Sequence, residues 1–547
     1  MTDTHTDSTR QTDHISNIAR PESLLGRSLT TGHMRDRAEM VTILDRIAED
    51  QVSSAATERH RSKGKLTAWE RVERLFDADT FQEFGALRRH RITGMGMDNN
   101  RPFRDGVITG WGLIHGRTAF CYALDSRVLG GSLGETQAAK IHRCLDMALS
   151  AGAPIIAIHD GAGARVQEGG LALAGFGGIF RRHVAASGVV PQLSLIMGAC
   201  AGGSAYAPAL TDMIFMVRGL SQMVITGPDV IATVTGDRPD LEFLGGAEAH
   251  GTRSGVASFV HEDEESCLEE VRWLLQLLPS SVNELPPEYS TDDPSGRPCE
   301  RLLDIVPAED RVAYDVREVI TELVDEGEFL EVQEGFARNV VCAMARIGGK
   351  SIGIVANQPL VLAGAMDIDS SSKAARFVGF CDAFHLPIVS LVDVPGFLPG
   401  VDQEHGGIIR HGAKLIFAYC RSTVPRIQVI MRKAFGGAYI VMDSLSIGAD
   451  LSVAWPTHTI GVMGAEGAVD LIYRRDIAAA PDPALRRMEL IDMYEKQVMQ
   501  PMTSAELGLV DRIINPVHTR EVIADALRTF QHKRHPANVV VHGVHPT

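Results

Sequence analysis

The sequence predicts an α/β protein built from two copies of one domain. Short apolar runs alternate with glycine-rich turns and helical patterns, as in PIIAIHDGAGARVQEG and PQLSLIMGACAGGSAYAPALTD, and this alternation is typical of a layered α/β core. Pro154 and Pro191 open two such units, and Pro387 and Pro425 open their counterparts in the second half. The offsets agree, because 387 − 154 is 233 and 425 − 191 is 234, which indicates an internal duplication.

The chain begins with a polar stretch and then becomes helical. Residues 1–36 lack an apolar pattern, so we predict a flexible N-terminal tail. Thr67 and Glu70 have the spacing of a capping box at the start of a helix. Residues 107–124 follow, with apolar runs separated by glycines that predict two strands.

A proline-rich and acidic stretch over residues 282–299 is the best linker candidate. It divides the chain into nearly equal halves. We therefore predict a first domain over residues 37–288 and a second domain over residues 289–547.

The composition restricts the class of function. With 547 residues, 45% hydrophobic and 22% charged, the chain is long enough for several folded domains and has an ordinary globular composition. A net charge of −16 argues against general nucleic-acid binding, which needs a positive field. No apolar run is long enough to span a membrane, and eight isolated cysteines predict reduced thiols and neither a zinc ribbon nor a disulfide framework.

Two glycine pairs at matched positions are the main candidates for catalysis. Gly202 and Gly203 follow an apolar strand and precede a helical pattern, and Gly436 and Gly437 do the same in the second half. Without a Cβ, an oxygen can approach the backbone N–H groups closely, and a helix start adds unpaired N–H groups and positive dipole. The pairs predict two oxyanion holes suited to a thioester enolate, although tight turns or close helix–strand packing also use such glycines.

Other catalytic motifs fail on inspection. Ser204 is not in a nucleophile elbow, because Tyr206 stands where that motif needs glycine. The IGGKS segment lacks the first glycine of a phosphate-binding loop, since Met344 occupies its place. His159 and Asp160 are adjacent, but an aspartate at a strand end more often closes a turn.

Several long motifs, in the same order, resemble one enzyme family. They include DGAGARVQEGG and SGVVPQLSLIMGACAGGSAYAPALTD in the first half, and SSSKAARFVGFCDAFHLPIVSLVDVPGFLPG and RKAFGGAYIVM in the second. From about Gly64 to Pro516 the chain resembles the β chains of propionyl-CoA and acetyl-CoA carboxylases, the carboxyltransferase subunits of biotin-dependent enzymes. The resemblance implies two duplicated crotonase-like domains, each a ββα superhelix, in a cytoplasmic homo-hexamer.

The resemblance also implies a reaction. Carboxybiotin releases carbon dioxide, the biotin nitrogen removes the α-proton of a short-chain acyl-CoA such as propionyl-CoA or acetyl-CoA, and the enolate attacks the carbon dioxide. No side-chain base and no metal are needed. The chain has no Met-Lys-Met biotin-attachment motif, so we expect biotin on a separate partner, an α subunit with biotin carboxylase and carrier parts.

By the same resemblance, the sites lie where the first half of one chain faces the second half of another. The implied oxyanion holes are Gly202–Gly203 for the acyl-CoA thioester and Gly437–Ala438 for biotin. Further implied contacts are coenzyme A with Gly163, Ala164, Arg165 and Lys373, biotin with Phe397 and Gly436, and the acyl chain with Ile440.

The sequence departs from the family pattern at five positions, Trp69, Ser126, Arg127, Ala162 and Ala199. These departures leave the acyl preference open. Three alternatives are a biotin-dependent acyl-CoA decarboxylase subunit, a methylcrotonyl-type carboxylase, and a non-catalytic paralogue that serves as a scaffold in a carboxylase complex.

Overall fold

The computed structural model describes Val41 and residues 52–533. The predicted tail at 1–36 lies outside these residues. Residues 52–533 lie in one compact unit, which contains two eight-stranded sheets. The linker and the boundary near residue 289 stay predictions, and the stretch between Leu277 and Leu302 has neither helix nor strand.

The first sheet has the strand order β1-β2-β3-β4-β5-β6-β8, with β7 paired to β5. Its strands are β1 Gln82–Glu83, β2 Val107–Ile114, β3 Arg117–Leu124, β4 Ile155–Gly161, β5 Gln192–Ala201, β6 Met213–Val217, β7 Gln222–Val224 and β8 Phe259–His261. The first three are antiparallel neighbours, and β3 onward run parallel.

The second sheet repeats this topology strand for strand. Its order is β9-β10-β11-β12-β13-β14-β16, with β15 paired to β13. Its strands are β9 Phe329–Val332, β10 Val340–Ile347, β11 Lys350–Asn357, β12 Ile388–Val394, β13 Arg426–Phe435, β14 Leu451–Ala454, β15 Thr459–Gly461 and β16 Arg512–Ile513. Even the register shift recurs, between His159 and Gly161 in β4 and between Val392 and Val394 in β12. The predicted duplication is confirmed.

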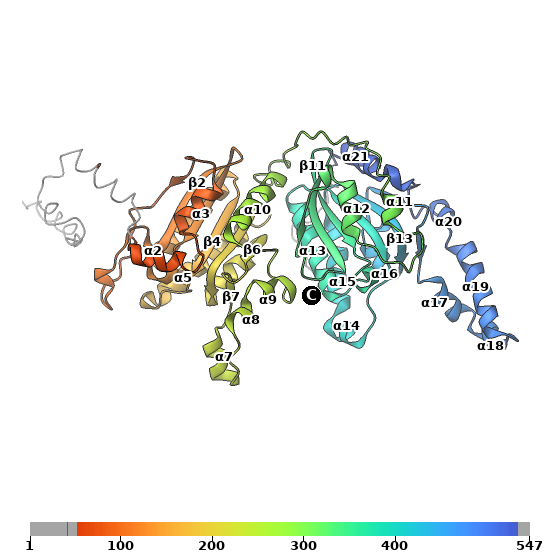
Figure 1. Ribbon diagram of the computed structural model, residues 1–547, viewed down its shortest axis with the longest axis horizontal. Coiled ribbons are helices and arrows are strands. Elements are labelled where there is room, and N and C mark those ends of the chain that lie inside the picture. Colours follow the sequence, from red (N-terminus) through yellow and green to blue (C-terminus); the bar gives the residue numbers. More distant parts are fainter. Residues whose placement is uncertain (1–40, 42–51, 534–547) are drawn as a thin grey trace, which may run out of the picture. The chain divides into compact units, whose positions relative to one another are not determined.

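Helices pack on both sheets (Figure 1). In the first half they are α2 Ser54–Arg61, α3 Ala68–Leu75, α4 Glu135–Ala151, α5 Gly170–Ala186, α6 Tyr206–Ala209, α7 Pro228–Thr235, α8 Leu241–Gly245, α9 Ala247–Thr252 and α10 Glu264–Leu277. In the second half they are α11 Leu302–Ile305, α12 Val316–Leu323, α13 Ile368–Ala383, α14 Val401–Gly406, α15 Ile408–Arg421, α16 Gly436–Val441, α17 Ala465–Ile472, α18 Arg474–Ala479, α19 Pro483–Val498, α20 Pro501–Glu506 and α21 Thr519–Thr529. The pair α4 and α5 pack together, as do α13 and α15.

The predicted capping box is present at α3. The Thr67 hydroxyl accepts a hydrogen bond from the Glu70 N–H at 3.2 Å, and the Thr67 N–H donates to the Glu70 carboxylate at 2.7 Å. These bonds satisfy backbone groups that the helix itself leaves unpaired, so the helix begins where the sequence predicts.

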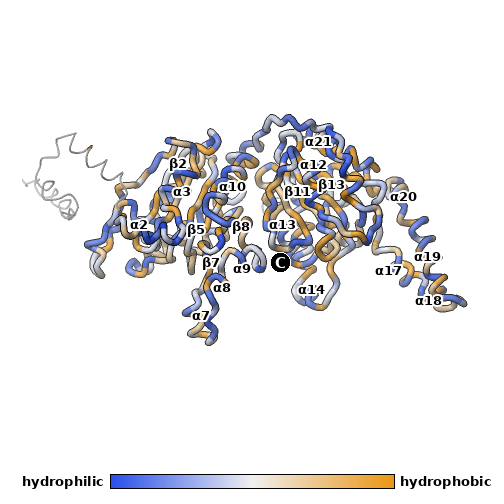
Figure 2. Tube along the Cα trace, viewed as in Figure 1, coloured by the Kyte–Doolittle hydropathy of each residue, from blue (hydrophilic) through white to orange (hydrophobic). Residues whose placement is uncertain are grey.

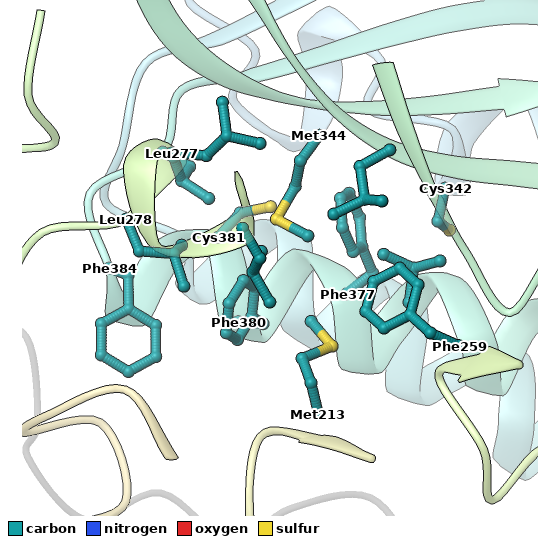
Figure 3. Packing of buried hydrophobic residues seen from close by; sticks show 14 of the residues in the cluster. Met213, Phe259, Leu277, Leu278, Cys342, Met344, Phe377, Phe380, Cys381 and Phe384 are labelled. Carbon is teal, nitrogen blue, oxygen red and sulfur yellow. The ribbon is translucent and has the colours of Figure 1, made fainter. Parts of the chain in front are cut away.

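The main hydrophobic core joins the two halves. Apolar segments concentrate in the strands (Figure 2), and one buried cluster includes strands of both sheets. In Figure 3, Met213 and Phe259 of the first half lie beside Phe377 and Phe380 of α13. This shared core explains why residues 52–533 lie in one compact unit.

Two further features concern the class of protein. All eight cysteines lie within the described residues and are free thiols, seven of them buried. Among the helices described between residues 52 and 533, none is long and apolar enough to cross a membrane.

Candidate active site: two duplicated glycine turns

The first glycine turn joins β5 to the helical residues that follow it. Gly202 has φ +62°, a conformation that costs little for glycine and is uncommon for other residues. It opens a 3₁₀ turn over Gly202–Ala205, which continues directly into α6. The chain therefore changes from strand to helix at the predicted oxyanion residues.

The second turn has the same geometry. β13 ends at Phe435, and Gly436, with φ +62°, begins α16. A Cβ on Gly436 would lie 3.1 Å from the carbonyl oxygen of Val462, and a Cβ on Gly202 would lie 4.0 Å from that of Ile225. The two turns are thus repeated with their neighbouring loops.

Each turn offers backbone donors to a developing negative charge. The first N–H groups of a helix have no intrahelical acceptor and lie at the positive end of the helix dipole. Gly203 and Gly437 present no side chain at these donors, and Ala438, the next residue of the second turn, is fully buried. An oxygen from a ligand can approach these groups, which is the geometric requirement of an oxyanion hole.

A loop from the preceding strand borders each turn. Near the first turn, the Leu133 N–H donates to the Gly163 carbonyl at 2.8 Å, and a Cβ on Gly163 would lie 3.1 Å from the carbonyl oxygen of Ala201. Ala164 forms an isolated bridge with Leu133. The structure therefore brings the predicted residues Gly163 and Ala164 beside the first turn.

The equivalent loop in the second half carries an aromatic ring. Phe397 bridges to Met366 as Ala164 does to Leu133, and 397 − 164 is the same offset of 233 that relates Pro387 to Pro154. The Phe397 ring lies 3.8 Å from the position of a Cβ on Gly437. The predicted biotin contacts Phe397 and Gly436 thus lie close together at the second turn.

Two predicted coenzyme A contacts have internal partners. The Arg165 guanidinium lies 2.8 Å from the Asp105 carboxylate and 2.9 Å from that of Glu168, and it is buried. The Lys373 ammonium donates to three backbone carbonyls, those of Gln333, Phe336 and Val340. Both cations hold the fold together, and a direct contact of either with coenzyme A stays a prediction.

Ile440 lies three residues after Gly437 on α16 and is 41% exposed. Residues three apart on a helix share a face. The side chain is therefore placed on the same side as the glycine turn and does not fill the core of this chain.

His159 and Asp160 do not form a catalytic pair. Burial lowers the pKa of His159 to about 3, so the ring is neutral, and its Nε2 lies 3.4 Å from the Ser194 hydroxyl. Asp160 instead accepts from the Lys65 ammonium at 2.7 Å and the Arg71 guanidinium at 3.1 Å. These contacts agree with the interpretation from the sequence that His159 and Asp160 are not a catalytic pair.

Three of the residues that differ from the family pattern, Arg127, Trp69 and Ala162, make different kinds of contact. Arg127 is paired with Asp125 at 2.7 Å, and Trp69 packs edge-on against Phe81 with ring centroids 6.0 Å apart. Ala162 lies 3.8 Å from the position of a Cβ on Gly130. Nothing in these contacts alters the glycine turns.

An aromatic series beside the first turn was missed in the sequence. The Phe176 ring lies 3.4 Å from the position of a Cβ on Gly203. Phe180 stacks on Phe176, and Tyr206 packs edge-on against Phe180. The spacing of four residues between Phe176 and Phe180 could have predicted that these two rings are neighbours on one helix. The contact of Phe180 with Tyr206 joins two different helices, and the sequence alone does not indicate it.

Two cavities in the compact unit lie elsewhere. One, of about 560 Å³, is lined by α13 and the segment 209–214. The other, of about 840 Å³, is lined by β8, β9 and their neighbouring loops. Neither includes a glycine turn, so the turns lie outside both enclosed spaces. Among the described residues, no group of three or more His, Cys, Asp or Glu side chains is arranged to hold a metal ion.

The carboxyl transferase domain family matches residues 59–543. The chain belongs to this family. Among its relatives, the carboxyltransferase subunit of propionyl-CoA carboxylase from Haloferax mediterranei is 52% identical over 486 residues, covering 89% of this chain and 93% of that protein. The methylmalonyl-CoA decarboxylase subunit alpha of Propionigenium modestum is 47% identical, covering 89% and 94%.

A solved structure supports the same membership in three dimensions. The transcarboxylase 12S hexamer, with methylmalonyl-coenzyme A and methylmalonic acid bound, matches with a TM-score of 0.91 and 46% identity, covering 94% of this chain and 99% of that chain. This match, together with the repeated strand order, confirms the predicted fold of two duplicated crotonase-like domains.

Proposed function

We propose that this carboxyltransferase is the β subunit of a cytoplasmic, biotin-dependent acyl-CoA carboxylase. It transfers a carboxyl group from carboxybiotin to the α-carbon of propionyl-CoA or acetyl-CoA. The observation that carries the proposal is the pair of glycine turns, alike in φ and in their strand-to-helix junction. The names of the relatives support the substrate class.

The first turn is the proposed thioester site. When the α-carbon loses its proton, negative charge develops on the thioester oxygen, and the backbone N–H groups of Gly202 and Gly203 stabilise it. A donor of this kind contributes about 3–4 kcal/mol to the transition state. The neighbouring residues Gly163 and Ala164 present at most a methyl group, which leaves space for coenzyme A.

The second turn is the proposed biotin site, and its residues fit the group. Gly436 and Gly437 have no side chain to obstruct a ureido carbonyl, and the start of α16 supplies N–H donors. The Phe397 ring beside Gly437 offers an apolar wall. When bound, carboxybiotin supplies carbon dioxide, and its ureido nitrogen accepts the α-proton.

The proposal includes an assembly. The turns lie in different halves, and we infer that the first half of one chain completes its site with the second half of another. The related transcarboxylase 12S is a hexamer, and we propose the same state here. A separate biotinylated α subunit delivers the carboxyl group.

The partial reverse reaction tests the function without that partner. The purified chain is incubated with methylmalonyl-CoA and free biotin, and propionyl-CoA is measured as the carboxyl group passes to biotin. Biotin-dependent formation of propionyl-CoA is expected. Its absence, with methylmalonyl-CoA and malonyl-CoA both tried, would favour the scaffold alternative over an active subunit.

One alternative has its own supporting observation. The 47% identity to a methylmalonyl-CoA decarboxylase subunit is compatible with a decarboxylase that runs the same chemistry in reverse. Affinity purification from native cells separates the two functions. A carboxylase recovers a biotinylated partner with ATP-dependent biotin carboxylase activity, whereas a decarboxylase recovers a membrane-embedded sodium-pump subunit.

A further inference from the structure

Comparison of the two halves shows that Tyr206, beside the first turn, is the counterpart of Ile440 beside the second turn. It stands 234 residues before Ile440, since 440 − 206 is 234, and Gly202 stands the same distance before Gly436. Both side chains are partly exposed, at 53% for Tyr206 and 41% for Ile440. The two positions are therefore structural equivalents at the surface of their turns.

The helix geometry directs both side chains toward the glycines. Tyr206 follows Gly203 by three residues within one continuous helical run, Gly202–Ala209. Side chains at positions i and i+3 share a helix face, and each leans toward the N-terminal turn. Tyr206 is thus placed on the same helix face as Gly203.

Two further rings support Tyr206 from below. Phe180 meets Tyr206 edge-on, with centroids 6.2 Å apart and ring planes at 77°. Phe176 stacks on Phe180 at 6.0 Å and reaches to 3.4 Å from the position of a Cβ on Gly203. The three rings form a continuous series from beneath the turn to its surface. This edge-on contact favours one orientation of the phenol ring.

In the second half, the residues that the structure describes contain no such series of rings. Four of the six buried residues of α5 (Ala172, Phe176, Ile179 and His183) have the same spacing as the buried residues of α15 (Ile408, Gly412, Leu415 and Tyr419). This alignment places Gly412 at the position of Phe176, and Ile416 at that of Phe180. The ring beside Gly412 comes instead from Phe397, 3.2 Å from the position of a Cβ on Gly412.

We propose that Tyr206 is a specificity-determining residue, whose ring limits the length of the acyl chain accepted at the first turn. The inference rests on the proposed function, because it needs the thioester at Gly202 and Gly203. An alkyl tail that extends from the thioester along the helix face meets the rigid ring. The aliphatic surface at Ile440 lacks the stacked rings beneath it and presents no comparable barrier.

The test compares variants in the full carboxylase, with the biotinylated partner, ATP and bicarbonate. kcat/KM is measured for acetyl-, propionyl- and butyryl-CoA with Tyr206→Ala and Tyr206→Phe. Tyr206→Ala is expected to raise the butyryl-to-acetyl ratio by about tenfold or more, the range for one or two methylenes in an apolar pocket. Tyr206→Phe keeps the ring and is expected to leave the ratio nearly unchanged. Val184→Ala, at an exposed position on α5, is the matched control.

Phe180→Ile, the residue of the second half, provides an independent variant. It retains the phenol and removes its support, so the ratio is expected to move in the same direction by a smaller factor. An unchanged ratio in folded Tyr206→Ala would overturn the proposal, as would an effect confined to the KM for biotin. If Tyr206→Ala does not fold, Phe180→Ile decides. A parent enzyme inactive with every acyl-CoA would refute the proposed function itself.

Discussion

The two halves bury an aspartate at the same strand end and neutralise it from different directions. In the first half, Asp160 accepts from Lys65 and from Arg71 of α3, both remote in sequence. In the second half, Asp393 is paired with Arg432 at 2.9 Å and with Lys433, both on the neighbouring strand β13. The halves therefore satisfy one electrostatic requirement by long-range and by local contacts.

Gly198 explains how the difference arose. It occupies the place in β5 that Arg432 occupies in β13, since 432 − 198 is 234. A side chain there would collide with the Asp160 carboxylate and the Lys65 ammonium. The missing side chain makes room for cations from outside the sheet. Duplication has preserved the buried charge pair and exchanged the source of its cation.

The largest expected effect comes from breaking either pair. Arg71→Met leaves Asp160 and Glu264 short of a guanidinium, and Arg432→Met removes bonds to Asp393 and to three backbone carbonyls. Removing one partner of a buried ion pair costs about 3–5 kcal/mol. Lys65 still pairs with Asp160 and Lys433 with Asp393, so both variants are expected to lose unfolding free energy toward the lower end of this range in denaturant titrations.

Arg74→Met is the matched control, because this arginine is 40% exposed and its carboxylate partner, Glu265, lies 3.6 Å away. A surface pair of this kind contributes about 0–1 kcal/mol. If Arg71→Met were as harmless as Arg74→Met while Arg432→Met was costly, the two halves would not share the requirement.

The glycine turns are expected to be equally essential. Gly203→Val and Gly437→Val place a branched side chain at the oxyanion donors, and each is expected to lower kcat about 10²–10³-fold. Light scattering should show the hexamer of the parent in both cases. Gly296→Val, where a Cβ meets no atom within 4 Å, controls for the substitution itself.

Near-normal kcat in either glycine variant, with both substrates saturating, would contradict the role of that turn. An active monomer in light scattering would contradict the proposed assembly. If kcat fell in only one of the two glycine variants, only that turn would take part in catalysis.

A buried histidine of the first half makes the fold sensitive to acid. Burial lowers the pKa of His159 to about 3 from its usual value of 6.5 and keeps the ring neutral. Below pH 6.5 the unfolded chain binds a proton that the folded chain does not, so stability falls with falling pH down to about 3. The loss between pH 7 and pH 5 is about 2 kcal/mol for one such group.

His159→Gln is expected to remove that part of the slope, measured as unfolding free energy against pH. The slope is the readout, because the substitution also changes the absolute stability. His405→Gln, at the surface, is the control. The corresponding core of the second half holds an Arg426–Asp443 ion pair at 2.8 Å. An unaltered slope in His159→Gln would place the acid sensitivity elsewhere.

The sequence predicts those features of the fold that neighbouring residues determine, such as turns and the ends of strands. The glycine turns and the prolines that open strands mark the ends of single elements, so their common offset revealed the duplication and both candidate sites. The equivalence of Phe176 and Gly412 was hidden because the offset changes from 233 at Phe397 to 236 on α15. Loop lengths between the strands differ, and only the packed helices show the alignment.

The sequence also could not show which residues would contact the buried cations. The resemblance implied Arg165 and Lys373 as coenzyme A contacts, yet each cation is satisfied by groups distant in sequence, Asp105 for the first and the Gln333 carbonyl among others for the second. Burying a cation requires such partners, but a single sequence does not state which remote groups provide them.

The smallest expected effect concerns Ile440 and the acyl preference. Ile440 lies on the face of Gly437, is partly exposed and carries no charge, so we expect that this position itself imposes only a relaxed preference among acetyl-, propionyl- and butyryl-CoA. Ile440→Asp places a carboxylate there and is expected to shift the kcat/KM ratios by about 1 kcal/mol, the lower end for one methylene in an apolar pocket. Ile472→Asp, at another exposed isoleucine, is the control. Unchanged ratios in an intact hexamer would leave Tyr206 as the proposed determinant of chain length, and would show that the two turns contribute unequally to substrate choice.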